Sequence, residues 1–205
     1  NDEFVVLELD HLLGRKELFR VVVLQVLNAV SQDLYLSKRD RRRLGFFDEA
    51  AHYLKAEGVG GGFSPLINMV DAAFRRARKY GGSFWVILQS VLDLLILGNL
   101  GRVIDANAAY KLYLRSTDFD KARAEKLLDC DDFELELMKS LTTVPGKYSE
   151  FFMSSPFGRG VGRLAFDPFN YLVNTSTPDE VAAIDSLVDR GLDYEEAIDE
   201  ILSAK

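Results

Sequence analysis

Short runs of apolar, β-branched and aromatic residues predict several buried strands along the chain. The clearest are Phe4–Asp10, Leu44–Phe47 and Ser83–Leu88, each bounded by polar or glycine residues. A fourth run, Val103–Asn107, is also interpreted as a strand. Runs of this length suit buried strands of a sheet that is covered by helices.

Longer apolar patterns between these runs predict helices. The pattern over residues 16–36 is too long for a strand and favours a buried helix. Apolar residues at three- and four-residue spacing predict another helix over residues 65–80, ended by Gly81–Gly82. Two short helices are expected over residues 118–141. Because strands alternate with helices, the pattern predicts an α/β fold with helices on both faces of the sheet.

The last third of the chain changes character. The runs Tyr148–Met153 and Val161–Phe166, joined by a turn, predict an antiparallel hairpin at the edge of the sheet. Two helices follow. The first begins at Thr177, with capping-box spacing and a proline at the first helical position, and the second begins at Asp193.

Composition narrows the class of protein. The 205 residues include 25 Lys and Arg and 32 Asp and Glu, a net charge of −7, and 48% are hydrophobic. This is globular composition, and we divide the chain into a core of residues 1–175 and a two-helix appendage of residues 176–205. The lone Cys130 excludes an internal disulfide, which favours the cytoplasm. The sequence has no apolar run of about 18 residues to span a bilayer. The acidic balance argues against nucleic acid as a partner.

The strongest chemical signal lies at the end of the second predicted strand. Leu44–Phe47 is followed directly by Asp48 and Glu49, an arrangement typical of the Walker B motif of nucleotide-hydrolysing motors. Asp48 is predicted to reach the ligand shell of a magnesium ion, which prefers oxygen ligands. Glu49 is predicted to polarise the attacking water as a general base. The alternative is a strand that ends in a solvated acidic turn.

Gln89 closes the next predicted strand and supplies a second signal. A glutamine there can bond the γ-phosphate or the attacking water, although a polar residue often ends a strand. Neighbouring strands of an open α/β sheet end along one crevice, where ligands bind, so we expect Gln89 near Asp48 and Glu49. The phosphate-binding sequence G-x-x-x-x-G-K-[ST] does not occur in the chain.

Five segments follow one another along the chain: Arg43–Leu54, Ala77–Gly82, Leu88–Ser90 with Asp93, Ile104–Ala108 and Gly160–Pro168. Their order and spacing resemble the C-terminal motor domain of the TraC-type ATPases of conjugative type IV secretion, over nearly the whole chain. The succession of the segments carries the resemblance.

The resemblance implies a RecA-like, P-loop NTPase-type motor with a mostly parallel sheet, which binds ATP and magnesium and forms a homo-hexamer. It implies a cytoplasmic protein, peripheral at the inner membrane, that contacts secretion components there and energises pilus assembly or substrate transfer. In that family the Walker A loop lies upstream of the segment corresponding to Phe4, so we expect this chain to be a C-terminal fragment, truncated at its N-terminus, that binds no nucleotide by itself. In a hexamer, Arg159 or Arg163 is a candidate to reach a neighbour's γ-phosphate.

Two other functions are consistent with the sequence. The absence of a phosphate loop and the two capped terminal helices suit a non-catalytic docking module of a secretion complex. The Walker B and glutamine signals also suit a DNA pump or coupling-protein relative, which a strongly basic channel face would support. Convergence of Asp48, Glu49 and Gln89 at one sheet edge would favour the motor over the docking module.

Overall fold

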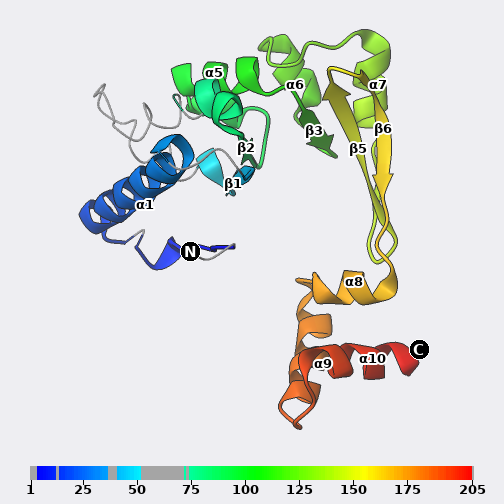
Figure 1. Ribbon diagram of the computed structural model, residues 1–205. Coiled ribbons are helices and arrows are strands. Elements are labelled where there is room, and N and C mark those ends of the chain that lie inside the picture. The colour runs from blue at the N-terminus through cyan, green and yellow to red at the C-terminus, as the bar shows by residue number, and fades with distance from the viewer. Residues whose placement is uncertain (1–3, 13, 37–40, 52–71, 73, 205) are drawn as a thin grey trace. The chain divides into compact units, whose positions relative to one another are not determined.

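The structure is a computed structural model that describes residues 4–12, 14–36, 41–51, 72 and 74–204. Two compact units make up these residues (Figure 1). Unit 1 comprises Asn1–Ala109, as far as it is described, and Lys121–Leu127. Unit 2 comprises Tyr110–Asp120 and Leu128–Lys205. Each unit is treated separately below.

A pair of parallel strands forms the centre of unit 1. Strand β1 (Arg43–Phe47) pairs in parallel with β2 (Gly82–Val86), and Phe46 lies opposite Trp85 in the register. Side chains alternate between half-buried and exposed along both strands, as a pleated strand with one covered face requires. Both strands therefore confirm the predicted runs, although β2 ends two residues earlier than expected.

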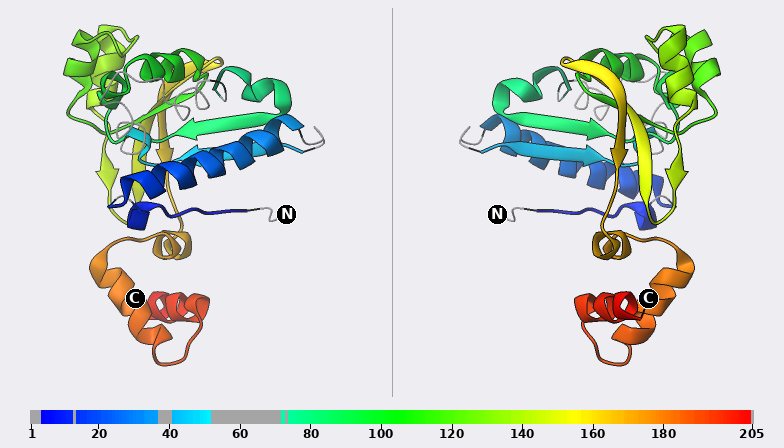
Figure 2. Two further views of the ribbon diagram at one scale, coloured as in Figure 1. Left: turned by 90° about the vertical axis from the view of Figure 1, so that its left-hand side faces the viewer. Right: turned by 90° about the vertical axis from the view of Figure 1, so that its right-hand side faces the viewer.

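The covered face of this pair packs on helices. Helix α1 (Lys16–Leu36) confirms the long helix predicted from its apolar pattern and lies alongside the two strands (Figure 2). Phe19 and Val23 of α1 join Leu100 and Ile104 in one buried cluster, against which Phe47 and Val86 pack. This cluster holds the strand ends against α1 and α5 (Asn99–Asn107).

Two predicted strands of unit 1 are wrong. Residues 4–9 form no strand and are followed by the 3₁₀ turn η1 (Asp10–Leu12). Phe4 is 84% exposed, and no strand of the described residues pairs with this segment, so its β-forming side chains gain nothing from a ladder. The Val103–Asn107 run belongs to helix α5. Leu100, Gly101 and Ile104 are buried there, at the three- and four-residue spacing of a helix. The run of residues 103–107 is too short to show this spacing, because it leaves out Leu100 and Gly101.

Short elements complete unit 1. Residues 65–71 and 73 of the predicted helix over 65–80 lie outside the described residues, as does the glycine-rich loop at 58–62. Residues 72 and 74–76 are helical, as predicted, and the 3₁₀ helix η2 (Ala77–Tyr80) follows them. Gly81 terminates η2 in a left-handed conformation at φ 73°, as predicted. The short helix α4 (Asp93–Ile96) precedes α5.

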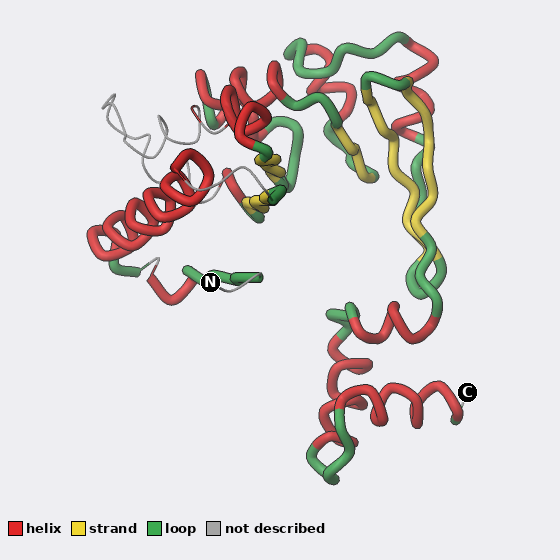
Figure 3. The backbone as a smooth tube through the Cα atoms, in the orientation of Figure 1, coloured by secondary structure: helices red, strands yellow, loops and turns green. Residues whose placement is uncertain are grey.

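Unit 2 is built around an antiparallel sheet. Its strands are β3 (Lys111–Leu114), β4 (Thr143–Val144), β5 (Tyr148–Ser155) and β6 (Gly158–Leu164). Strand β5 pairs with the other three strands, and the long β5–β6 hairpin stands out in Figure 3. The predicted hairpin is confirmed, but its predicted place at the edge of the parallel sheet is wrong, because β5 and β6 belong to a separate antiparallel sheet in which β5 pairs with three strands. Strands β3 and β4 were not predicted.

The two short helices predicted over 118–141 are confirmed. Helix α6 (Phe119–Ala124) runs across the boundary of the units, and α7 (Asp132–Lys139) packs against β5 and β6. Helix α7 begins with a capping box, in which Asp131 and Glu134 bond each other's backbone N–H groups.

Three helices end the chain. They are α8 (Pro168–Val173), which was not predicted, α9 (Pro178–Val188) and α10 (Tyr194–Ser203). Leu172, Ile184 and Ile198 form their shared core. Asp193 makes the complete capping box of α10, whereas Thr177 makes no side-chain hydrogen bond at the start of α9. The division into residues 1–175 and 176–205 stays a prediction. Among the described residues, no helix is both long and apolar enough to cross a membrane.

Candidate active site

The carboxyl ends of β1 and β2 carry the predicted site. Two backbone hydrogen bonds continue the pairing beyond the strands. Ile87 N donates to Phe47 O (2.9 Å), and Ala50 N donates to Ile87 O (3.2 Å). Asp48 and Glu49 therefore leave β1 at the same edge at which Gln89 leaves β2, as expected for parallel neighbours.

The backbone turns sharply at Glu49. Its φ is +47°, in the left-handed region that residues other than glycine seldom adopt. The Glu49 N–H donates to Asp48 Oδ1 at 2.9 Å, a local bond that supports the turn. The side chains of Asp48 and Glu49 are both exposed at the strand end; Asp48 continues the alternation of β1, and Glu49 breaks it.

Gln89 and Glu49 meet across this edge. Gln89 Nε2 donates to Glu49 Oε1 at 3.2 Å, although 40 residues separate them in sequence. The turn after Gln89 is closed by its own bonds, since Ser90 N donates to Asp93 Oδ2 at 3.0 Å and Leu92 N donates to Ser90 Oγ at 3.1 Å. Both sides of the predicted pair are thus held by ordered backbone.

The side chains at this edge suit magnesium. The exposed carboxylate of Asp48 provides a hard oxygen ligand of the kind that the ion prefers, beside the carboxylate of Glu49. In the part of the chain that the structure describes, no group of three or more His, Cys, Asp or Glu side chains is placed to enclose a metal ion. This donor set fits an ion that takes one or two protein carboxylates and draws its other ligands from water and phosphate.

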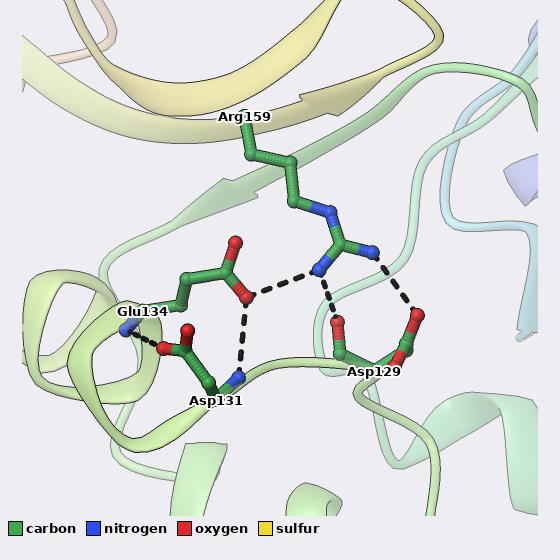
Figure 4. Close-up of polar contacts among 4 residues, drawn as sticks. All are labelled: Asp129, Asp131, Glu134 and Arg159. Atoms are coloured by element: carbon green, nitrogen blue, oxygen red, sulfur yellow. Dashed lines mark hydrogen bonds and ion pairs between the residues drawn. The ribbon is translucent and has the colours of Figure 1, made fainter.

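Arg159, one of the two arginines singled out, lies on β6 of unit 2 and is held within that unit. Its Nη1 donates to Asp129 O (2.7 Å) and to Glu134 Oε2 (3.0 Å), while Nη2 donates to Asp129 Oδ2 (3.0 Å). Figure 4 shows the guanidinium between Asp129 and the capping box that Glu134 forms with Asp131. The hydrogen bond with Asp129 is the main cause that raises the pKa of Arg159. This arrangement ties β6 to the start of α7.

Arg163, the second arginine, lies four residues further along β6. Its Nη2 donates to Glu150 Oε1 at 2.7 Å, and its guanidinium carbon is 3.9 Å from the centre of the Tyr148 ring. Glu150 also accepts two hydrogen bonds from Thr142. The bond from Arg163, followed by those from Thr142, lowers the pKa of Glu150 to about 2.

The sequence did not indicate the partners of either arginine. Arg159 is 30 residues from Asp129 and 25 from Glu134, and Arg163 is 13 residues from Glu150. The only available signal was the hairpin prediction, because residues 150 and 163 face each other once β5 and β6 are in register.

Comparison with known proteins gives consistent results. The family described as the TraG P-loop domain matches residues 1–205. Protein TraC of Escherichia coli (strain K12) is 23% identical over 205 residues, covering 96% of this chain and 22% of TraC. The structure of VirB4 of Thermoanaerobacter pseudethanolicus is similar with a TM-score of 0.52 and 21% identity, over 84% of this chain and 41% of that chain. The chain therefore spans about a fifth of TraC. The family match and the structural similarity confirm the predicted RecA-like α/β fold.

Proposed function

The chain belongs to the TraG P-loop domain family, as its resemblance to TraC-type proteins predicted, and from that premise we propose that it is the hydrolytic part of an ATPase of type IV secretion. The proposed ATPase powers pilus assembly or substrate transfer. The observation that carries the proposal is the meeting of Gln89 and Glu49 (Nε2 to Oε1, 3.2 Å) beside Asp48. The similarity to TraC supports it.

Each residue of this edge has a proposed role. Asp48 would hold a magnesium ion, whose positive charge would offset the negative charge of the nucleotide phosphates. Glu49 accepts the proton of the attacking water as a general base. Gln89 assists by hydrogen bonding at the same edge. All three side chains are exposed, so nucleotide and water can reach them.

The same geometry favours a motor over a docking module. A docking module has no need for a carboxylate pair and a glutamine at one sheet edge, and the alternative of a solvated acidic turn does not account for the contact from Gln89. The coupling-protein or DNA-pump alternative differs from the leading proposal in what is moved. In both cases the proposed ATP hydrolysis is the same.

Assembly and partners belong to the proposal as well. A homo-hexamer would bring an arginine of one subunit to a neighbour's nucleotide, where its fixed charge stabilises the transition state. Arg163 would have to release Glu150 to do so, whereas Arg159 would have to break three hydrogen bonds. Arg163 is therefore the better candidate of the two. Contact with inner-membrane secretion components, from the cytoplasmic side, completes the proposed setting.

A phosphate-binding loop must come from outside these 205 residues, because G-x-x-x-x-G-K-[ST] does not occur in them. We accordingly propose that the 205-residue chain by itself binds no ATP tightly, and that an intact protein with such a loop does. Calorimetry of the 205-residue chain with ATP and magnesium tests this, and micromolar binding would contradict it.

Replacement of the proposed base tests the function itself. In the intact protein, Glu49→Gln is expected to lower ATP turnover at least about 100-fold, the typical contribution of a general base, while ATP binding is retained. The matched control is Glu125→Gln, an exposed glutamate at the end of the α6 region, which should turn over at the wild-type rate. Wild-type turnover in Glu49→Gln would refute the assignment.

A further inference from the structure

We propose that Gln89 is a positioning residue that acts through Glu49, and that it does not bind the nucleotide phosphates itself. This inference rests on the proposed function, since it assigns the way in which the base of that reaction is oriented. It begins from the hydrogen bond between Gln89 Nε2 and Glu49 Oε1 (3.2 Å).

The backbone of the sheet brings the two residues together. The backbone bonds Ile87 N to Phe47 O and Ala50 N to Ile87 O fix the two strand ends relative to each other. Gln89 follows the first of these anchors by two residues, and Glu49 directly precedes Ala50. The backbone of β1 and β2 therefore places the two residues at one edge, within reach of each other's side chains.

The backbone of Glu49 points to the same role. A φ of +47° is energetically unfavourable for a residue with a Cβ, and such conformations persist where the surroundings impose them. The bond from Glu49 N to Asp48 Oδ1 restricts the turn further. Among the described residues, the hydrogen bond from Gln89 is the contact that orients the carboxylate. It occupies Oε1 and leaves Oε2 to accept a proton from water.

The two possible roles of Gln89 have different consequences. A glutamine that binds phosphate directly contributes to nucleotide affinity whether or not Glu49 is a carboxylate. A glutamine that orients Glu49 contributes to the rate of the chemical step, and its contribution disappears once the carboxylate is removed. The proposal therefore predicts a strong coupling between the two positions.

The hydrogen bond is testable in the 205-residue chain by NMR of side-chain amides. The sequence has three glutamines, so Gln25 and Gln32 serve as references in the same spectrum. In Glu49→Gln the Gln89 side-chain amide signal should shift, because its acceptor changes from a carboxylate to an amide, while the Gln25 and Gln32 signals stay in place. In Asp48→Asn the Gln89 signal should move clearly less. A Gln89 signal that does not move in Glu49→Gln, or that moves as far in Asp48→Asn, would overturn the proposal.

Kinetics of the intact protein test the role. Gln89→Ala should lower kcat about 10-fold, as loss of one orienting hydrogen bond implies, with the ATP affinity unchanged. In the Glu49→Gln background, Gln89→Ala should change neither quantity. A 10-fold loss of ATP affinity in both backgrounds would instead make Gln89 a phosphate ligand and refute the inference. An intact protein without any ATPase activity would refute the proposed function, while the NMR result would still decide whether the pair exists.

Discussion

Replacement of Gly101 by alanine sets local propensity against packing. Gly101 lies inside helix α5, where glycine is about 1 kcal/mol less favourable than alanine, so propensity alone predicts a more stable protein. The structure predicts the reverse. A Cβ on Gly101 would lie 2.1 Å from the backbone oxygen of Leu94, far inside contact distance. Because the obstacle is backbone, no side-chain rotation relieves it, and α4 and α5 must move apart. Overpacking of this kind typically costs about 1–3 kcal/mol. The obstacle is backbone, so we take the upper end of that range, about 3 kcal/mol, and subtract the propensity gain of about 1 kcal/mol. The free energy of unfolding should therefore fall by about 2 kcal/mol.

Urea unfolding followed by tryptophan fluorescence measures this effect. Trp85 is the only tryptophan and belongs to unit 1, as Gly101 does, so the signal reports the unit that is changed. The control is Ala106→Gly at an exposed position in the last turn of the same helix, which should lose no more than about 1 kcal/mol from propensity alone. A Gly101→Ala protein as stable as the wild type, or more stable, would refute the close packing of α5 on α4.

Two further predictions concern unit 2. Arg163 is the main cause that lowers the pKa of Glu150 to about 2, so the ionised form of Glu150 stabilises the fold at neutral pH. This contribution is lost as the pH falls from about 4.5 towards 2. The urea midpoints at pH 6 and pH 3 should therefore differ less in Glu150→Gln than in the wild type, and an equal difference would contradict the prediction. Asp193→Ala removes the capping box with Glu196 and should reduce the stability of α10 by about 1 kcal/mol. Thr177→Ala should reduce the stability of α9 clearly less, because Thr177 makes no side-chain cap bond. Hydrogen exchange of the backbone amides measures the loss of stability in each helix, and equal losses would contradict the prediction.

Much of the fold follows from patterns that are local in sequence. Helix α1 was predictable because its apolar residues recur over 21 residues, and β1 and β2 because buried parallel strands are short apolar runs. The site was predictable for a related reason. Parallel strands end at one edge, so residues that follow them are neighbours even when 40 positions apart, as Glu49 and Gln89 are.

The rest depended on contacts that the sequence does not display. Strand β3 reads Lys-Leu-Tyr-Leu, yet Leu112 and Leu114 are 45% and 62% exposed while Lys111 and Tyr113 are half-buried. Hydrophobicity therefore indicated neither its existence nor its inner face, and only its pairing with β5 defines it. The segment at residues 4–9 shows the opposite case, since β-forming residues without a partner strand form no strand.

The proposed site differs from the hydrophobic core in what its side chains contribute. Asp48, Glu49 and Gln89 are exposed, and backbone hydrogen bonds at Ile87 and Ala50 hold the strand ends without their help. Substitution of these three side chains should therefore change chemistry much more than folding. Stability also gives no reason for a glutamate at φ +47°, because glycine adopts that conformation at lower cost. Glu49 is thus unfavourable for its own backbone conformation and unnecessary for the core, and it bonds to Gln89 at the end of the neighbouring strand. The function of its carboxylate is the best explanation for a glutamate at this position.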